Sequence, residues 1–276
     1  SQADEWVGKG LISRDSRVFR SIRGLERRVL DQVDGVVFVS ESARQDLWTG
    51  NVDVPTATIP NFLTVQPLPA SVPRRADLLS IGTLEPRKNH RFLLDTLAAA
   101  KRSGRRYTLD IAGAGPERRR LLDQAEALGL DDQVRLLGHV PEASRLLAGY
   151  RAYAHSAKSE VFGLALIEAM AAGVPVVAPP VGGMPTLFDD KVEGRFWDLD
   201  DPEGAAAVLI ELLDDEPARV RMGEAARQRF VDHFDAAAVC PDLYRFLASV
   251  PSRTASASPT DGASPNDSRR GLPQPA

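Results

Sequence analysis

Two glutamates in one apolar stretch have the spacing to bind an activated sugar. Glu160 and Glu168 lie in the segment SEVFGLALIEAMAAGVPVVAPPVGG. Gly163 interrupts the chain between them, and Leu164–Ala172 is predicted to form a helix, which places Glu160 in the preceding loop and Glu168 about one turn inside. A helix N-terminus binds anions through unpaired N–H groups, and carboxylates accept hydrogen bonds from sugar hydroxyls. We therefore expect a phosphate at this helix with a sugar on each side. In the simpler alternative, Glu160 caps the helix and Glu168 faces solvent.

Two cations lie in a second segment, IGTLEPRKNHRF, which follows a predicted strand and begins a predicted helix. In an open parallel sheet, ligands bind beyond the carboxyl ends of the strands. Arg87 and Lys88 could neutralise a diphosphate there. They could also be solvated surface cations, but the start of a helix is unfavourable for positive charge, which favours a functional reason.

Glycines and histidines give weaker signals. Gly113 and Gly115 follow a predicted strand, but Arg118 stands where a dinucleotide fingerprint has its third glycine, which argues against a nicotinamide site. A tight turn that lets the backbone approach a ligand remains reasonable. The four histidines show no metal-binding spacing. His155 ends a strand just before Glu160 and could face the same pocket, although a structural role is the more common one for each histidine.

Short apolar runs alternate with helical patterns along most of the chain. The predicted strands are Val36–Ser40, Thr56–Ile59, Leu78–Ile81, Thr108–Ala112, Val134–Leu137, Ala152–His155 and Val174–Ala178. The helices between them are predicted to begin at Asn89, Pro116 and Asp201. This alternation predicts βαβ units and a parallel sheet, and therefore an α/β fold.

Composition excludes several classes of protein. The 276 residues are 43% hydrophobic and 26% charged, with a net charge of −4, which is typical of a soluble globular protein and gives no global field that recruits nucleic acid. No apolar run approaches the roughly 18 residues that a membrane span needs. The single cysteine, Cys240, cannot form an internal disulfide, which fits a cytoplasmic location. The chain begins with Ser1, so we expect a processed chain or a fragment.

The two ends of the chain differ from the rest. Arginines and apolar residues alternate with helical spacing near Arg14–Arg28, which predicts a basic amphipathic helix. Such a helix could contact an anionic membrane peripherally, but a surface helix with a solvated basic face is the simpler interpretation. The segment 251–276 is rich in Pro and Ser and is predicted to be disordered. Pro60–Pro73 is predicted to separate two domains.

The motifs in their order resemble the retaining family 4 glycosyltransferases, which use nucleotide-sugar donors and have the two-domain GT-B fold. The resemblance covers about 25–247 and rests on DGVVFVSESARQDL, TIPN, LLSIGTLEPRKNHRFLL, LDIAGAGPERRRL, VRLLGHVPE and the glutamate segment. It implies a Rossmann-like donor domain with a parallel sheet at 71–235, part of a Rossmann-like acceptor domain at 1–70 and a crossover helix at 236–250, before the disordered tail.

The resemblance also implies a role for each matching residue. Glu168 would hold ribose hydroxyls, and Glu160 would hold hydroxyls of the donor sugar. Lys88, with Arg87 nearby, would neutralise the diphosphate, so that Glu160, Lys88 and Arg87 are the predicted catalytic residues. The other predicted donor-binding residues are Phe162, Gly163, Leu164 and Ala165 at the phosphates, His139 and Val140 at the base, and Gly82, Thr83, Gly113 and Gly115 in the neighbouring turns.

The sequence departs from the family pattern in three places. Family members usually have a further N-terminal stretch that carries most of the acceptor site, so the chain is expected to be N-terminally incomplete. Many members have Gly-Arg where this chain has Gly82-Thr83, and many have Glu at the position of Thr186. One diphosphate cation is therefore missing, or Arg87 replaces it.

The implied function is retaining transfer of a hexose from a nucleotide-sugar to a glycan or lipid-linked acceptor, without metal or cofactor. The motif GTLEPRKN resembles that of a subset of the family that includes mannosyltransferases, which favours GDP-mannose as the donor. UDP-glucose, UDP-N-acetylglucosamine and dTDP-rhamnose stay open. Two alternatives remain. One is a nucleotide-sugar-binding module that is inactive alone or needs a partner. The other is a sugar-nucleotide epimerase of similar fold, for which acid and base residues across the cleft are not evident.

Overall fold

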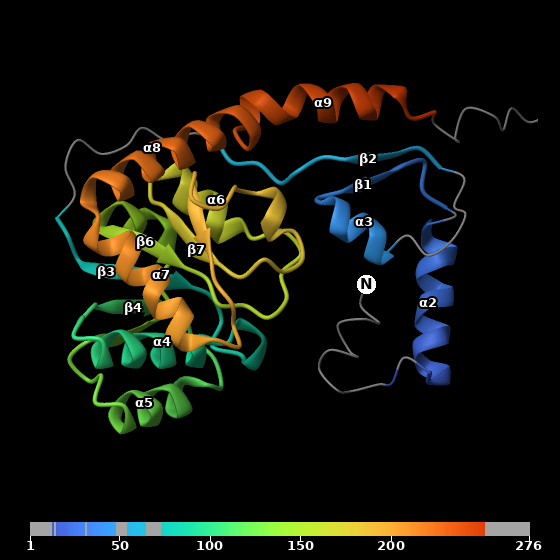
Figure 1. Ribbon diagram of the computed structural model, residues 1–276. Coiled ribbons are helices and arrows are strands. Elements are labelled where there is room, and N and C mark those ends of the chain that lie inside the picture. Colours follow the sequence, from blue (N-terminus) through green and yellow to red (C-terminus); the bar gives the residue numbers. More distant parts are fainter. Residues whose placement is uncertain (1–12, 14, 31, 48–53, 65–72, 252–276) are drawn as a thin grey trace, which may run out of the picture.

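The computed structural model describes residues 13, 15–30, 32–47, 54–64 and 73–251. They form a large α/β unit and a smaller N-terminal part, and a C-terminal helix runs over both (Figure 1). The predicted disordered tail from 252 onward and 65–72 of the predicted boundary lie outside the described residues. No described helix is long and apolar enough to cross a membrane.

A parallel sheet of six strands forms the centre of the large unit. Its strand order is β5-β4-β3-β6-β7-β8, and every neighbouring pair is parallel. The strands are β3 (Ala76–Ile81), β4 (Leu109–Ala112), β5 (Val134–Gly138), β6 (Tyr150–Ala154), β7 (Val176–Ala178) and β8 (Gly194–Phe196). β7 is buried along its whole length and β3 along most of it, as expected for strands that are covered on both sides.

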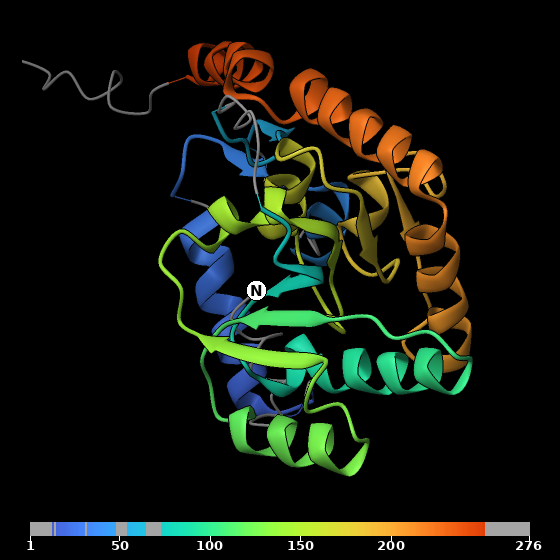
Figure 2. The same ribbon diagram turned by 90° about the vertical axis from the view of Figure 1, so that its left-hand side faces the viewer.

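Helices cover both faces of the sheet. One face carries α4 (His90–Arg102), α5 (Arg118–Ala127) and α7 (Pro202–Asp214), and Figure 2 shows α4 beside α5. The other face carries α6 (Leu164–Ala171), α8 (Glu216–His233) and the short 3₁₀ helix η2 (Ala143–Gly149). Leu78 packs into the first layer and Leu79 into the second, because successive side chains of a strand point to opposite faces. Burying each contributes about 1.5–3 kcal/mol.

The strand order reverses between β3 and β6. From β3 the chain adds β4 and β5 on one side, and then returns to place β6 on the other side of β3. The loops that follow β3 and β6 therefore leave the sheet in opposite directions, and a crevice opens between them at the carboxyl ends of the strands. This topological switch point is the usual ligand site of an open α/β sheet.

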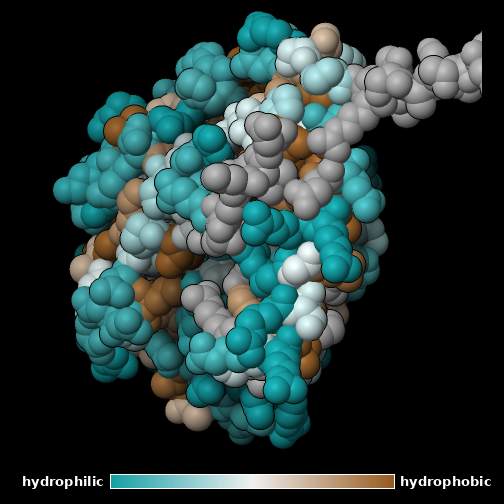
Figure 3. Space-filling view, turned by 90° about the vertical axis from the view of Figure 1, so that its right-hand side faces the viewer, coloured by the Kyte–Doolittle hydropathy of each residue, from teal (hydrophilic) through white to brown (hydrophobic). Residues whose placement is uncertain are grey.

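The described residues of the N-terminal part form two helices and two short strands. These are α2 (Arg17–Leu30), β1 (Val36–Phe38), α3 (Glu41–Leu47) and β2 (Thr56–Thr58), and β1 pairs with β2 in parallel. The Ser40 hydroxyl donates to the Val161 carbonyl at 3.0 Å, which ties this part to the loop after β6. Figure 3 views the molecule from the side of the N-terminal part, and this face is mainly hydrophilic with apolar side chains interspersed.

The last helix connects the two parts. α9 (Ala236–Ser249) follows α8 and extends over the N-terminal part (Figure 1). Its beginning pairs with the segment after β2, because Leu63 N donates to the Phe234 carbonyl at 3.0 Å and Ala236 N donates to the Leu63 carbonyl at 2.8 Å. Its end lies against Gly35, where an added Cβ would be 3.2 Å from the Phe246 ring.

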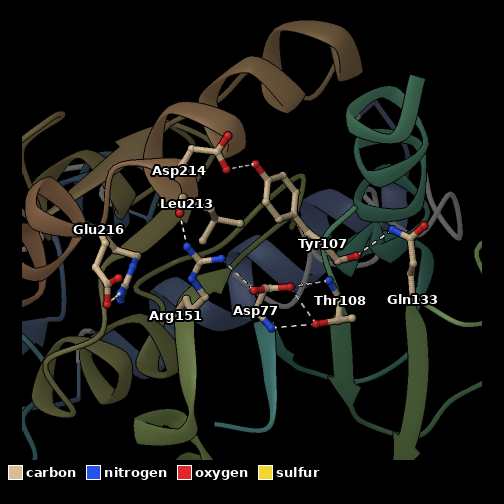
Figure 4. Close-up of polar contacts among 9 residues, drawn as sticks. Asp77, Tyr107, Thr108, Gln133, Arg151, Leu213, Asp214 and Glu216 are labelled. Atoms are coloured by element: carbon tan, nitrogen blue, oxygen red, sulfur yellow. Dashed lines mark hydrogen bonds and ion pairs between the residues drawn. The ribbon is translucent and has the colours of Figure 1, made fainter. Parts of the chain in front are cut away.

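A polar network closes the end of the sheet opposite the switch point (Figure 4). Arg151 of β6 donates to Asp77 of β3 at 2.9 Å and also to the Leu213 carbonyl at the end of α7. Asp77 accepts the backbone N–H and the hydroxyl of Thr108, each at 2.9 Å. The network therefore fixes β3 and β6 side by side, and with them the two loops at the other end.

Most predicted elements are present, with three corrections. β8 and the helices α3 and α8 were not predicted, because β8 is only three residues with Gly and Arg, and α8 buries few apolar residues. Asn89 precedes α4 as predicted, but its backbone is left-handed (φ 53°) and its side chain makes no capping hydrogen bond within the described residues. α5 begins two residues after Pro116, whereas the Asp201 carboxylate caps α7 by accepting from Gly204 N at 2.9 Å.

Candidate functional site

Two loops meet at the switch point and hold each other in place. The loop after β3 contains the 3₁₀ turn η1 (Pro86–Lys88). The Ser156 hydroxyl, which follows β6, donates to the Lys88 carbonyl at 2.8 Å, and Lys158 N donates to the Arg87 carbonyl at 2.9 Å. The Arg87 side chain donates back to the Ser159 carbonyl at 2.9 Å. These bonds bring the predicted cations next to the predicted sugar-binding glutamate.

Lys88 and Glu160 form the central ion pair. Lys88 Nζ donates to Glu160 Oε2 at 2.5 Å, and both side chains are only 17% exposed. Arg87 Nη1 lies 3.8 Å from the same oxygen. Burial alone would raise the pKa of the Glu160 carboxyl, but the hydrogen bond and charge of Lys88, together with His155 and Arg87, hold that pKa below its ordinary value. Glu160 is therefore a carboxylate at neutral pH.

His155 is buried next to this ion pair. It is the residue that directly follows β6, it is 4% exposed, and its Nε2 lies 3.8 Å from Glu160 Oε2. Its Nδ1 lies 3.4 Å from the Tyr153 hydroxyl. Burial, followed by the charge of Lys88, lowers the pKa of His155 to about 4, so the ring is neutral at pH 7. The sequence-based expectation that this histidine could face the pocket agrees with its position.

Glu168 lies one turn inside α6, as predicted. Gly163 is the residue before this helix, with φ 100°, and no described side chain caps it. The alternative in which Glu160 caps the helix is therefore wrong. The N–H groups of the first turn, near Leu164, remain available to an anion. Burial raises the pKa of the half-buried Glu168 carboxyl, in contrast to Glu160.

These residues line one cavity of about 410 Å³. Its walls come from both parts of the chain: Lys88, His155, Glu160, the backbone turn 161–165 and Glu168 from the large unit, and Val39 and Asn61 from the N-terminal part. Val39 and Asn61 were not predicted as site residues, and only the short motifs VSES and TIPN mark their neighbourhood. A larger hollow of about 940 Å³ lies over the start of α4, and none of the predicted donor residues is among the described residues that line it.

The remaining predicted residues do not line this cavity in the described structure. A Cβ on Gly113 would lie 1.8 Å from the Gly82 carbonyl, and one on Gly115 would lie 2.5 Å from the Leu84 carbonyl. Glycine at these positions therefore lets the loop after β4 pack on the loop after β3. Thr83 is exposed beside them, and His139 and Val140 follow β5, two strands away from β3. A role for them in donor binding stays a prediction.

Gly182 and Gly183, which were not predicted as site residues, position the Glu160 loop. A Cβ on Gly182 would lie 1.9 Å from the Glu160 carbonyl, and one on Gly183 would lie 2.4 Å from the Val161 carbonyl. Gly183 N donates to the Glu160 carbonyl at 3.2 Å. The glycine pair after a buried strand is the sequence signal for such a close approach.

Comparison with known proteins adds independent findings. A family model described as "Glycosyl transferases group 1" matches residues 69–229. A phosphatidyl-myo-inositol mannosyltransferase of Mycobacterium leprae is 30% identical over 237 residues, which are 83% of this chain and 62% of that protein. A glycogen synthase of Mycobacterium tuberculosis is 35% identical over 173 residues, 61% of this chain and 42% of that protein. The chain thus spans less than two thirds of the length of these relatives.

Solved structures show the same arrangement of elements. HepE of Anabaena in complex with UDP-glucose superposes with a TM-score of 0.72 at 21% identity, covering 82% of this chain and 67% of that one. The pneumococcal O-GlcNAc transferase GtfA in complex with UDP and GlcNAc gives a TM-score of 0.69 at 21% identity, covering 79% and 46%. At this level of identity, the likeness concerns the fold.

Proposed function

Since the chain belongs to the glycosyl transferases group 1 family, we propose that it transfers a hexose from a nucleotide-sugar donor to a glycan or lipid-linked acceptor with retention of anomeric configuration. The fold predicted from the sequence, α/β of GT-B type, is confirmed by the parallel sheet and by the superposable structures. The reaction would serve synthesis of a polysaccharide or glycoconjugate.

One observation carries the proposal. Lys88, the two glutamates and the N-terminus of α6 line a single cavity at the switch point of the sheet. A cation and helix N–H groups are suited to a diphosphate, and carboxylates are suited to sugar hydroxyls. Since Lys88 Nζ is hydrogen-bonded to Glu160, the sites for phosphate and donor sugar would adjoin. Glu168 would take the ribose, one turn along the helix.

The residues suggest how the reaction is accelerated. Negative charge develops on the diphosphate as the bond to the anomeric carbon breaks. Lys88 and the N-terminus of α6 are held in place before that charge forms, so they stabilise the transition state electrostatically. The Arg87 side chain is 44% exposed and can turn toward a bound phosphate. We assign no side chain as a nucleophile.

The donor is proposed to be GDP-mannose or a UDP-sugar. The GTLEPRKN motif and the similarity over 83% of the chain to a protein named as a mannosyltransferase support mannose. The superposable HepE structure contains UDP-glucose, which supports a UDP-sugar.

Calorimetric titration with UDP, GDP, ADP and dTDP, with and without Mg²⁺, tests this proposal. We expect saturable binding of one nucleotide, unchanged by the metal, and a higher affinity for the corresponding sugar donor. Binding of none of the four would contradict the assignment of the cavity. Incubation with the donor that binds then tests for catalysis, since release of the nucleotide indicates transfer or hydrolysis and would exclude a nucleotide-sugar-binding module without activity.

A peripheral membrane contact and a cytoplasmic location stay predictions. α2 exposes Val18, Leu25 and Val29 on one side, and five of its other positions are arginines. An acceptor linked to lipid would be reached from such a surface, and anionic lipid would attract the arginines.

A further inference from the structure

We infer that His155 is a positioning residue that holds the Glu160 carboxylate in the orientation in which it receives hydroxyls of the donor sugar. The inference rests on the proposed function, because it assigns Glu160 to that sugar. It concerns a residue that the sequence motifs did not distinguish from a structural histidine.

Three nitrogen atoms surround one oxygen of Glu160. Lys88 Nζ is 2.5 Å from Oε2, and Arg87 Nη1 and His155 Nε2 are each 3.8 Å from it. The two cations are also assigned to the diphosphate. A phosphate that draws Lys88 or Arg87 toward itself weakens their hold on the carboxylate, whereas His155 has no second task. It is therefore the group suited to keep Oε2 in place, with Oε1 turned to the sugar.

The negative charge of Glu160 favours the required tautomer of the ring. The Tyr153 hydroxyl donates its single proton either to the Ile81 carbonyl at 3.3 Å or to His155 Nδ1 at 3.4 Å. If the hydroxyl donates to Nδ1, the proton of the neutral ring is on Nε2 and faces the Glu160 carboxylate. The other tautomer would direct a lone pair of Nε2 at a negatively charged oxygen. The Nε2–H form is therefore the electrostatically favoured one.

The histidine is fixed in place by its backbone, and one of its ring nitrogens has no hydrogen-bond partner among the described residues. Its backbone N–H donates to the Val177 carbonyl at 2.8 Å, and its backbone carbonyl accepts from Trp197 Nε1 at 3.0 Å. Within the described part of the chain, the buried Nε2 has no hydrogen-bond partner. A buried polar atom without a partner is unusual in a folded protein. At 3.8 Å the contact with Glu160 is too long for a hydrogen bond, but such contacts often shorten when the substrate binds.

His155 acts through Glu160 and not on the ligand itself. The ring is 5% exposed, whereas the Glu160 side chain, whose Oε2 lies 3.8 Å from Nε2, is 17% exposed and more open to a ligand. Its loss should therefore reduce affinity for the sugar portion of the donor and leave affinity for the free nucleotide unchanged.

A pair of matched variants tests this role. The amide nitrogen of His155→Gln can reach the position of Nε2, whereas that of His155→Asn reaches only the position of Nδ1. Both are polar, smaller than histidine, and expected to cost similar stability, which thermal unfolding checks. The full chain is titrated with UDP and UDP-glucose and with GDP and GDP-mannose, and the pair with the higher affinity is used for all variants.

We expect His155→Asn to bind the sugar donor about tenfold more weakly, with free nucleotide affinity within about twofold of the unmodified chain. His155→Gln should restore most of the donor affinity. Equal losses in the two variants, or equal losses for donor and nucleotide, would overturn the inference and leave a structural role. If the unmodified chain binds neither member of either pair, the proposed function itself is wrong.

Discussion

Glu160 and Glu168 are identical side chains near one helix N-terminus, and their surroundings change their pKa in opposite directions. Lys88 hydrogen-bonds Glu160 and keeps its pKa low, so that it stays ionised as an acceptor beside a cation. Glu168 is half-buried, and burial raises its pKa. Because their surroundings differ in this way, we assign the two carboxylates to different portions of the donor.

Substituting each glutamate separately should divide donor binding into its two portions. Glu168→Ala removes the proposed hydrogen bonding to the ribose, worth roughly 1.5–3 kcal/mol in total because the acceptor is charged, so nucleotide affinity should fall about 10- to 100-fold. Glu160→Ala should leave free nucleotide affinity unchanged and weaken binding of the intact donor. Calorimetry with the free nucleotide and the sugar donor measures both.

The exposed Glu224 of α8 provides the control for charge, and Glu224→Ala should alter neither affinity. Unchanged nucleotide binding by Glu168→Ala would refute its assignment to the ribose. Equal losses for the two ligands in Glu160→Ala would refute the division between the glutamates.

At the scale of elements, glycines let the loops approach one another closely enough to form the site. The segment after β7 passes over the Glu160 loop at Gly182, and the loop after β4 passes over the loop after β3 at Gly113. Each side chain of the site therefore depends on backbone contacts made by another strand–loop unit. A methyl group at such a crossing displaces the loop that carries the chemistry.

Gly182→Ala should impair both stability and donor binding, whereas Gly104→Ala should impair stability only slightly. Both glycines have left-handed backbone, with φ 55° and 79°, which costs an alanine about 1 kcal/mol. At Gly104 a Cβ meets no described atom within 4 Å, but at Gly182 it would lie 1.9 Å from the Glu160 carbonyl. Urea unfolding and donor titration of both variants measure the difference. Equal behaviour would show that the loop yields without consequence for the site.

At the scale of the whole molecule, stability depends on keeping two buried histidines neutral. Burial, with a contribution from Lys88, lowers the pKa of both His90 and His155 to about 4. The unfolded chain binds these protons already near pH 6.5, so between pH 6.5 and pH 4 it holds more protons than the folded chain. The free energy of unfolding should therefore be fully retained above pH 6.5 and decrease as the pH falls through this range.

The expected decrease is roughly 1–3 kcal/mol per histidine, measured by urea unfolding at several pH values between 7 and 4. His90→Gln should make the dependence on pH shallower, since glutamine has no such proton to bind. His139 is exposed, and His139→Gln should leave the dependence unchanged. An identical pH dependence in His90→Gln and the unmodified chain would show that His90 does not supply this term.

Local signals in the sequence determined the strands, the positions of the two glutamates and the family of this protein. The apolar runs predicted seven strands that are all present within a few residues, because strand pattern and turn residues are short-range properties. For the same reason Glu160 was placed in a loop and Glu168 inside a helix from the position of Gly163 alone. The motifs around them were sufficient to indicate the family.

The tertiary structure decided which of these residues meet. Lys88 and Glu160 are 72 residues apart and form an ion pair because β3 and β6 are neighbours in the sheet. The contact between the two parts of the chain adds Asn61 to the cavity, and the fold of the segment after β6 brings His155 Nε2 to 3.8 Å from Glu160 Oε2. The tertiary structure also gives Gly113 a packing role, although the sequence around it is equally compatible with a turn that approaches a ligand. Such contacts depend on how distant segments are arranged in space, which spacing along one chain does not encode.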